Sequence, residues 1–340
     1  MSTTHPSDAS PAAPESMESA APAATGAFRI PGVRLIFRYG IVWAAILAVV
    51  VASFISDSFL TKTNLQDALT QNAALALVAL GLTFVMIGGA FDLSSGPLVG
   101  ACTVVAATLA NHTSTVVTVL VTIGIGAAAG ALNGFLITVC RINAFVATLA
   151  TGSMFTGAAL QYTGAKTVYI DNSSLNGLAL NTFLGVRITV LIVIVLYIIG
   201  AIILAKSVFG RTLYAVGGNE VSARLAGLRV HLIRFLTFVI VGGACGAGGV
   251  IFAARFTSGN SATGSSITLD AITVVIIGGT SLFGGSGAVW RTAVGVVLLA
   301  TITNVFDLLA INSAWQFITK GALLIAAVGL DYVTTHRQKS

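Results

Sequence analysis

The acidic residue Asp92 lies in the segment Gly88–Gly96, between two strongly apolar stretches of the chain. A carboxylate at the centre of a lipid bilayer costs roughly 2.5–3.5 kcal/mol on insertion scales, so Asp92 is expected to face protein, water or an interface. One interpretation is that Asp92 and Ser94 cap the helix that follows, by accepting hydrogen bonds from its free N–H groups. The other is that Asp92 takes a direct part in a path for a polar solute.

The segment Phe209–Arg229 forms a long polar stretch in which charged and apolar residues alternate. Gly217 and Gly218 permit a turn, Asn219 can cap a helix, and residues 220–227 fit one or two amphipathic helical turns. This design is typical of a short helix that docks into a soluble partner. From the residues alone, an ordinary solvated loop remains the alternative.

The apolar stretch that begins at Leu269 ends in a series of glycines before Gly287. Glycines allow tight turns and a close approach of backbone to backbone. A break of this kind at membrane depth needs protein or a water-filled path around it. The tripeptides Ile87-Gly88-Gly89 and Ile277-Gly278-Gly279 also repeat one pattern, which hints at an internal duplication.

Residue constellations for catalysis are missing from the sequence. The serines lack a plausible histidine and aspartate partner set, and the carboxylates are too dispersed to form an acid–base pair. The segment Gly259–Ser266 has the glycine spacing of a phosphate-binding loop, but Ser265 stands where the lysine belongs. The three cysteines and four histidines show no metal-ligand spacing. We therefore expect no enzyme and no metal site, and any ATP that drives this protein is hydrolysed by another chain.

The composition indicates that lipid is the solvent of this chain. Hydrophobic residues make up 56% and charged residues 8%, and the mean hydropathy is +0.96, which lies far outside the range of soluble domains. The net charge of +6 does not indicate nucleic acid, because the basic residues are scattered between apolar runs. We predict an all-α integral membrane protein with about ten transmembrane helices, or eight to ten if some are short or interrupted, since most runs approach about 20 residues. The runs cover roughly residues 39–56, 70–89, 97–111, 116–139, 144–163, 188–206, 233–254, 269–279, 288–308 and 315–333.

Charge and composition also predict the topology. Residues 1–28 are rich in Pro, Ala, Ser and Thr without an apolar period, which predicts a disordered cytoplasmic tail. The transmembrane domain follows over 29–335, with the polar segment at 207–231, and residues 336–340 form a second cytoplasmic tail. Basic residues concentrate on one side of such a chain, so the positive-inside rule places both termini in the cytoplasm. The opposite side, or its vicinity, receives Lys62, Lys166, Arg187, Arg255 and Lys320.

Small residues recur at four-residue spacing in two of the apolar runs. Gly126, Gly130 and Gly134 form one set, and Gly242 and Gly246 form the other. Each set lies on one face of a helix, where glycines allow neighbouring helices to pack closely.

Together these segments resemble the permeases of the ribose, xylose and galactose ABC importers, a family related to the branched-chain amino acid permeases. Gly88–Gly96 is similar to an acidic Gly-Gly-Ile-Asp-Leu-Ser pattern of that family, and Gly210–Gly227 is similar to its cytoplasmic segment. Asn133-Gly134, Phe145–Thr151 and Leu269–Gly287 match further pieces, and the resemblance covers about 35–333. Thr268 departs from the pattern, because the family has a glutamate there.

The resemblance implies a multi-pass permease subunit of the bacterial inner membrane that imports a monosaccharide. Two permease copies would pair over two cytoplasmic ATPase subunits, and a periplasmic sugar-binding protein would deliver the sugar. ATP and Mg²⁺ would be used by the ATPase, with no cofactor on this chain. The residues expected to couple to the ATPase are Gly217, Gly218, Asn219, Glu220, Ala223, Arg224 and Gly227. Those expected to line the translocation path are Asp92, Ser94, Asn133, Phe145, Thr148 and Asp270.

Two alternatives remain open. The same machinery could carry branched-chain amino acids or another small polar solute, since the permease sequence does not fix the ligand. An ion-coupled secondary transporter would need intramembrane ionisable groups, for which Asp92, Asp270 and Asp307 are sparse candidates.

Overall fold

The computed structural model describes residues 40–171 and 174–337, besides Ser2. Apart from Ser2, the predicted tail at 1–28 lies outside the described residues, as does most of the predicted tail at 336–340. The described chain from Gly40 onward is almost entirely helical, as expected. Its elements in chain order are α2 (Gly40–Ile55), α3 (Lys62–Gln71), α4 (Ala73–Ile87), α5 (Ser95–Ala110), α6 (Thr115–Thr138), α7 (Ala144–Thr163), β1 (Val168–Tyr169), α8 (Gly177–Leu180), β2 (Thr182–Phe183), β3 (Val186–Arg187), α9 (Ile188–Lys206), α10 (Val208–Gly218), α11 (Glu220–Leu225), α12 (Val230–Phe256), β4 (Ser258–Gly259), the 3₁₀ helix η1 (Ser261–Gly264), α13 (Ile267–Ile277), α14 (Val289–Leu308) and α15 (Ser313–Arg337).

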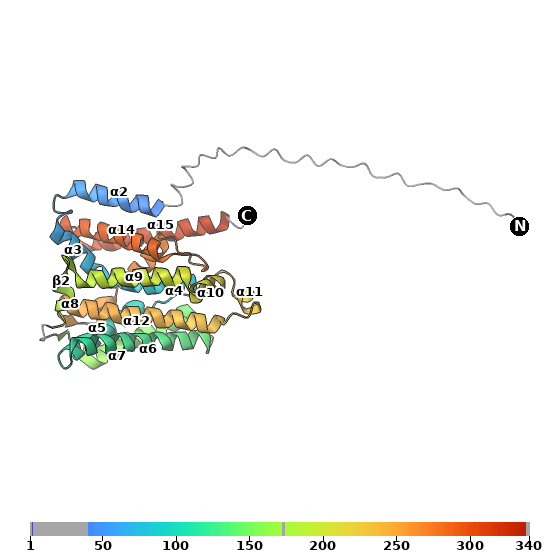
Figure 1. The fold of residues 1–340 in the computed structure, drawn as a ribbon, viewed down its shortest axis with the longest axis horizontal. Coiled ribbons are helices and arrows are strands. Elements are labelled where there is room, and N and C mark those ends of the chain that lie inside the picture. Colours follow the sequence, from blue (N-terminus) through green and yellow to red (C-terminus); the bar gives the residue numbers. More distant parts are fainter. Residues whose placement is uncertain (1, 3–39, 172–173, 338–340) are drawn as a thin grey trace. The chain divides into compact units, whose positions relative to one another are not determined.

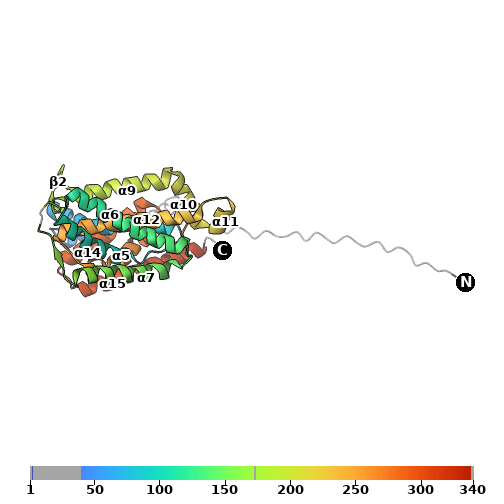
Figure 2. The ribbon, with the colours of Figure 1, turned by 90° about the horizontal axis from the view of Figure 1, so that it is seen from below.

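The long helices run side by side and define two ends of the bundle (Figure 1). One end carries α10 and α11 and is called the α11 end. The opposite end, called the α3 end, carries α3, α8 and two short antiparallel strand pairs, β1 with β4 and β2 with β3. In Figure 2, α7 and α15 lie along the same side of the bundle.

Span lengths agree with the expected membrane protein only in part. Within the described residues, the helices that are long and apolar enough to cross a membrane are α6, α9, α12 and α14. Helices α3 and α4 together make up to a fifth span, bent by 45°. Helices α2 and α5 and the stretch Ser261–Ile277 are apolar but shorter. The short runs expected before and after glycine-rich breaks thus appear as α5 and α13.

Helix α4 lies at the centre of the bundle. Every residue from Ala73 to Ile87 is buried, whereas α9 exposes large apolar residues such as Val195 and Ile202 on its outer side. A helix that is apolar all round carries no periodic signal for which face points inward. The burial pattern is therefore set by packing and could not be predicted from the alternation of residues.

The two glycine sets face each other between α6 and α12. A Cβ atom on Gly126 would collide with the carbonyl oxygen of Gly242, and one on Gly130 would collide with that of Phe238. The backbones of the two helices are thus in direct contact, which confirms the close packing predicted from the spacing.

The repeated Ile-Gly-Gly pattern forms the same helix end twice. Gly89, after α4, has φ +74° and Gly279, after α13, has φ +75°. In each case the next residue donates a 3.2 Å backbone hydrogen bond back into the helix, from Ala90 to Val85 and from Thr280 to Val275. A left-handed glycine that ends a helix in this way satisfies its last carbonyl groups. Helices α4 and α13 thus both terminate toward the α11 end of the bundle.

Candidate functional site

Asp92 lies in the break between α4 and α5 and is 1% exposed. Its Oδ1 atom accepts two hydrogen bonds from Ser94, at 2.8 Å from the backbone N–H and at 2.6 Å from the hydroxyl. The hydroxyl of Ser95 donates at 3.1 Å to the backbone carbonyl of Asp92. Asp92 thus holds Ser94 and Ser95, the residues that lead into α5, by three hydrogen bonds.

The hydroxyl of Ser94 connects Asp92 to α6, and through α6 to α7. Asn133 on α6 donates from Nδ2 to Ser94 Oγ at 2.7 Å, and Thr151 on α7 donates from Oγ1 to Asn133 Oδ1 at 2.6 Å. In this series of hydrogen bonds every donor points toward the carboxylate of Asp92, so each bond polarises the next. Thr148, one helical turn before Thr151, accepts a 3.0 Å hydrogen bond from the backbone N–H of Leu93.

Most of the residues predicted to line a path come together in this network, which we call the Asp92 network. Asp92, Ser94, Asn133 and Thr148 all belong to it, and their buried side chains are at most 1% exposed. Phe145 does not belong to it, because its side chain is on the outside of α7 and is 56% exposed.

Asp270 lies elsewhere as well, on α13, where it pairs with Lys320. Thr151 joins the Asp92 network although it was not among the predicted site residues. Its position three residues after Thr148, on the same face of one helix, was the available signal.

The capping hypothesis is correct for Asp92 only in a modified form. Ser94 occupies the N-cap position of α5, but its side chain makes no hydrogen bond to a helix N–H group. Its hydroxyl instead donates to Asp92 and accepts from Asn133. Asp92 holds the residue that precedes the helix, so the expectation that Ser94 caps α5 was wrong.

The polar segment expected at 207–231 forms two helices rather than a solvated loop. Leu213 and Val216 of α10 are buried, with exposed fractions of 0% and 1%. Asn219 accepts a 2.9 Å hydrogen bond from the backbone N–H of Ser222 and so caps α11, as predicted. Gly217 and Gly218 do not form a turn but are the last residues of α10.

Close packing explains these glycines. A Cβ atom on Gly217 would collide with the carbonyl oxygen of Ile87 and would lie 2.7 Å from the backbone nitrogen of Gly285. A Cβ atom on Gly284 would lie 2.8 Å from Gly89, and one on Gly285 would lie 2.6 Å from Gly218. We call these contacts the glycine junction, formed by Gly89, Gly217, Gly218, Gly284 and Gly285. It joins the end of α10 to the end of α4 and to the loop that follows α13.

Ion pairs connect α11 to α12 beside the glycine junction. Glu220 contacts Arg234 of α12 at 2.7 Å and Arg224 of its own helix at 2.7 Å. Arg234 also donates from Nε to the carbonyl oxygen of Gly88 at 3.2 Å. Burial alone would raise the pKa of Glu220, but the guanidinium groups of Arg234 and Arg224 outweigh it and hold this pKa below its usual value of 4.5. Arg234 was not predicted as a site residue, since its partners are distant in sequence.

The outer side of α11 stays open. Val221 is 69% exposed and Leu225 is 85% exposed, whereas Ala223 is buried against the bundle. Gly227 follows the helix with φ +78°. A short helix with a buried inner face and apolar residues on its outer face is suited to docking against another protein.

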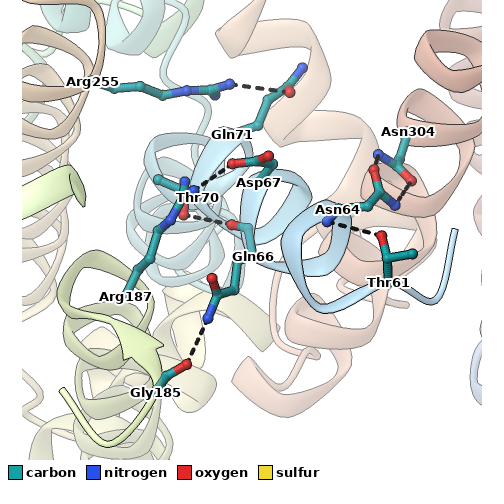
Figure 3. Close-up of polar contacts among 10 residues, drawn as sticks. All are labelled: Thr61, Asn64, Gln66, Asp67, Thr70, Gln71, Gly185, Arg187, Arg255 and Asn304. Atoms are coloured by element: carbon teal, nitrogen blue, oxygen red, sulfur yellow. Dashed lines mark hydrogen bonds and ion pairs between the residues drawn. The ribbon is translucent and has the colours of Figure 1, made fainter. Parts of the chain in front are cut away.

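Helix α3 forms a separate polar cluster at the other end of the bundle (Figure 3). Asp67 pairs with Arg187 at 2.6 Å, and Gln66 donates to the carbonyl oxygen of Gly185 at 2.6 Å. Asn64 and Asn304 exchange amide hydrogen bonds of 2.8 and 2.9 Å. These contacts fix α3 to α14 and to the β2–β3 hairpin.

Residues 64–328 match the family model described as branched-chain amino acid transport system / permease component. The ribose import permease protein RbsC of Bacillus subtilis (strain 168) is 34% identical over 295 residues, which cover 84% of this chain and 89% of that protein. The probable ABC transporter permease protein YphD of Escherichia coli (strain K12) is 34% identical over 305 residues, with coverage of 89% and 92%. The L-arabinose transport system permease protein AraH of the same strain is 32% identical over 311 residues, with coverage of 87% and 92%. No solved structure matches the chain.

Proposed function

Because this chain belongs to the family of branched-chain amino acid transport system permease components, we propose that it forms the path by which a monosaccharide crosses the bacterial inner membrane. It is the multi-pass permease subunit of an ATP-binding-cassette importer, which confirms the resemblance drawn from its motifs. A subunit of this kind transports and does not catalyse. ATP and Mg²⁺ are then bound by the separate ATPase chain.

The observation that carries the choice of a sugar is the extent of the similarity to sugar permeases. The alignment with the ribose import permease covers 84% of this chain and 89% of the relative, and the alignment with the L-arabinose permease covers 87% and 92%. Similarity over most of the chain extends well beyond a single motif. Branched-chain amino acids are the second candidate, favoured by the description of the family itself.

The proposed topology has about ten membrane crossings, in which short and broken helices count together with the four long ones. The α11 end faces the cytoplasm and the α3 end faces the periplasm. The distribution of basic residues supports this orientation. Segments at the α11 end contain Arg141, Lys206, Arg211, Arg224, Arg229, Arg234 and Arg291, whereas the described segments at the α3 end contain Lys62, Lys166, Arg187 and Arg255.

The partners follow from this orientation. An importer permease works with an ATPase and a binding protein. We place the ATPase on α11, where Val221 and Leu225 are exposed, and the sugar-binding protein on the α3 end. A second copy of this chain completes the assembly, and the remaining apolar surface contacts lipid. In this arrangement the segment that contains Gly217, Gly218, Asn219, Glu220, Ala223, Arg224 and Gly227 serves the coupling, and its residues contribute unequally.

The test is reconstitution with the partners encoded in neighbouring reading frames, which are expected to include a Walker A ATPase and a secreted sugar-binding protein. The three chains, assembled in proteoliposomes with ATP, should accumulate radiolabelled D-ribose or L-arabinose but not L-leucine. Accumulation of L-leucine alone would replace the sugar by the second candidate. Uptake that continues without ATP in a sodium or proton gradient would contradict the ABC mechanism.

A further inference from the structure

A half-buried ion pair joins α13 to α15. Lys320 Nζ and Asp270 Oδ2 are 2.8 Å apart, and their side chains are 21% and 12% exposed. The other ion pairs among the described residues lie at the two ends, around Asp67 and around Glu220. This pair is different because it lies between the two ends, about 10 Å along α15 from Ser313 at a rise of about 1.5 Å per residue.

The start of α13, close to Asp270, is hydrogen-bonded to α5. Thr268 accepts a 2.7 Å hydrogen bond from the backbone N–H of Gly96, in the first turn of α5. The ion pair therefore lies near the first turn of α5. The Asp92 network contacts the same turn of α5 through Ser94. Charged groups within a membrane face the bundle interior or a water-filled cavity, because exposure to lipid costs several kcal/mol.

A cavity of about 310 Å³ opens in front of the pair. Its lining combines the polar residues Ser265, Ser266, Thr273, Asp270 and Lys320 with the apolar residues Leu269, Phe317 and Leu324 and with Gly321. The volume is at the lower end of the roughly 300–1,000 Å³ of small-molecule sites. Phe317 is 63% exposed, so its ring is free to contact a ligand.

The groups on the wall match the surface of a sugar. A carboxylate accepts hydrogen bonds from hydroxyl groups, and an ammonium group with three N–H donors gives hydrogen bonds to hydroxyl oxygens. The structure describes one hydrogen bond for Lys320, to Asp270, which leaves further donors for a ligand. An aromatic ring offers an apolar face to the C–H groups of a pyranose or furanose. The two charges cancel, which suits a neutral polyhydroxyl solute better than an ion.

We propose that this cavity is a sugar subsite of the translocation path, in which Asp270 and Lys320 hydrogen-bond the hydroxyl groups of the passing monosaccharide and Phe317 packs against its ring. The subsite rests on the proposed function and deepens it. It is separated from the Asp92 network by the first turn of α5 and by η1, where Gly264 and Gly96 are in backbone contact. The Asp92 network is closed, since its side chains are buried, whereas the ion pair of Asp270 and Lys320 borders a cavity.

The first experiment measures access to the cavity in the assembled permease, ATPase and binding-protein complex. Ser266→Cys is introduced with Cys140→Ser, because Cys140 is the exposed cysteine among the described residues while Cys102 and Cys245 are buried. Labelling by 2-aminoethyl methanethiosulfonate is followed in membrane vesicles with 100 mM D-ribose, L-arabinose, L-leucine or sucrose. A decrease of labelling rate of about threefold or more with a pentose, but not with sucrose or L-leucine, is expected.

Each other result contradicts the proposal in a distinguishable way. Labelling that is slow in all solutes, or unchanged by the pentoses while uptake is intact, overturns the subsite and leaves the sugar importer standing. Protection by L-leucine alone overturns the subsite and the proposed sugar together.

The second experiment separates ligand binding from a purely structural role of the ion pair. Lys320→Met should raise the KM of pentose uptake by about tenfold and should also lower the melting temperature, because Asp270 loses its partner. Phe317→Leu, which leaves the ion pair in place, should raise the KM by about threefold while the melting temperature of the complex stays near wild type. Asp307→Asn is the matched control, since Asp307 contacts Gln71 and Gln316 at the α3 end. The charge swap of Asp270→Lys with Lys320→Asp should stay folded but transport poorly. If the swap restores full uptake, or if Phe317→Leu leaves the KM unchanged, the pair only pins α13 to α15.

Discussion

The backbone N–H of Gly285 donates a 2.9 Å hydrogen bond to the carbonyl oxygen of Ile87, and Gly217 lies against both groups. Tyr214 strengthens the junction by donating from its hydroxyl to the carbonyl oxygen of Gly287 at 2.8 Å. Three chain segments that are distant in sequence thus meet backbone to backbone. If α10 and α11 contact the ATPase as proposed, a movement of α10 would reach the end of α4 and the loop after α13 without passing through flexible side chains.

Replacement of Gly217 by alanine should therefore uncouple the importer. The new Cβ atom would collide with the carbonyl oxygen of Ile87, so the junction must open. Uptake and the ATPase rate stimulated by the binding protein should both fall by about tenfold or more, with the permease still in the membrane. The matched control is Gly218→Ala, whose Cβ atom would meet only Gly285 Cα at 4.0 Å. Equal behaviour of the two variants would contradict the role of the junction.

The ion pair between Glu220 and Arg234 should matter more than the pair between Glu220 and Arg224. Arg234 also bonds the carbonyl oxygen of Gly88, whereas Arg224 forms an exposed pair within one helix, which is worth little. Arg234→Met should lower stimulated ATPase activity strongly, and Arg224→Met should change it less than about twofold. Stimulated ATPase rates of the reconstituted complex decide the comparison, and a larger loss for Arg224→Met would contradict it.

The lowered pKa of Glu220 predicts the pH dependence of this contact. A carboxyl whose folded pKa is depressed contributes stability that is fully present above its unfolded value, here near 4.5, and that is lost as the pH falls through the lower folded pKa. The wild type and Glu220→Gln should therefore differ by a constant factor in stimulated ATPase activity between about pH 6 and 8. A difference that disappears within that range would show that another group controls the contact.

Asp92 should act by holding the start of α5 rather than by its charge. Asparagine can still accept from the N–H and hydroxyl of Ser94, so Asp92→Asn should retain much of the uptake. Asp92→Leu leaves these buried groups without a partner, at a cost of about 1–3 kcal/mol each, and should lose uptake and melt at a lower temperature. If both variants lose uptake equally while both remain in the membrane, the charge itself is required.

The contact between α6 and α12 should tolerate no side chain at its centre. Gly130→Ala places a Cβ atom on the carbonyl oxygen of Phe238 and should destabilise the permease by about 1–3 kcal/mol. Gly124→Ala, on the same helix but with no atom within 4 Å of its Cβ, should be neutral or slightly stabilising. Thermal unfolding of both variants in one detergent tests the pair, and equal melting temperatures would show that the helices separate easily.

Features encoded by neighbouring residues could be predicted from the sequence. Asn219 caps α11 because a side-chain oxygen reaches an N–H group three residues ahead. The two glycine faces followed from four-residue spacing, since a helix turns once in about 3.6 residues. The breaks before α5 and after α13 followed from glycines that end apolar runs.

Contacts between distant segments could not be predicted in the same way. Arg234 and Gly88, or Lys320 and Asp270, are brought together only by the packing of whole helices. The sequence also did not show that the side chain of Phe145 lies on the outer face of α7, away from the Asp92 network, because a largely apolar helix does not show which face is buried. Gly217 and Gly218 look alike in the sequence, and only the position of Ile87 distinguishes them.

The direct contact of α6 with α12 also constrains how the protein is made. Helix α6 ends at Thr138 and α12 begins at Val230, so at a synthesis rate of about 5–20 residues per second α6 leaves the ribosome several seconds before its partner. Until α12 is inserted, the glycine face of α6 borders lipid or an earlier helix, and α5, which packs against both, lacks one of its neighbours. The central part of the bundle is therefore completed late in synthesis, after the segment between Cys140 and Arg229 has already been threaded through the membrane.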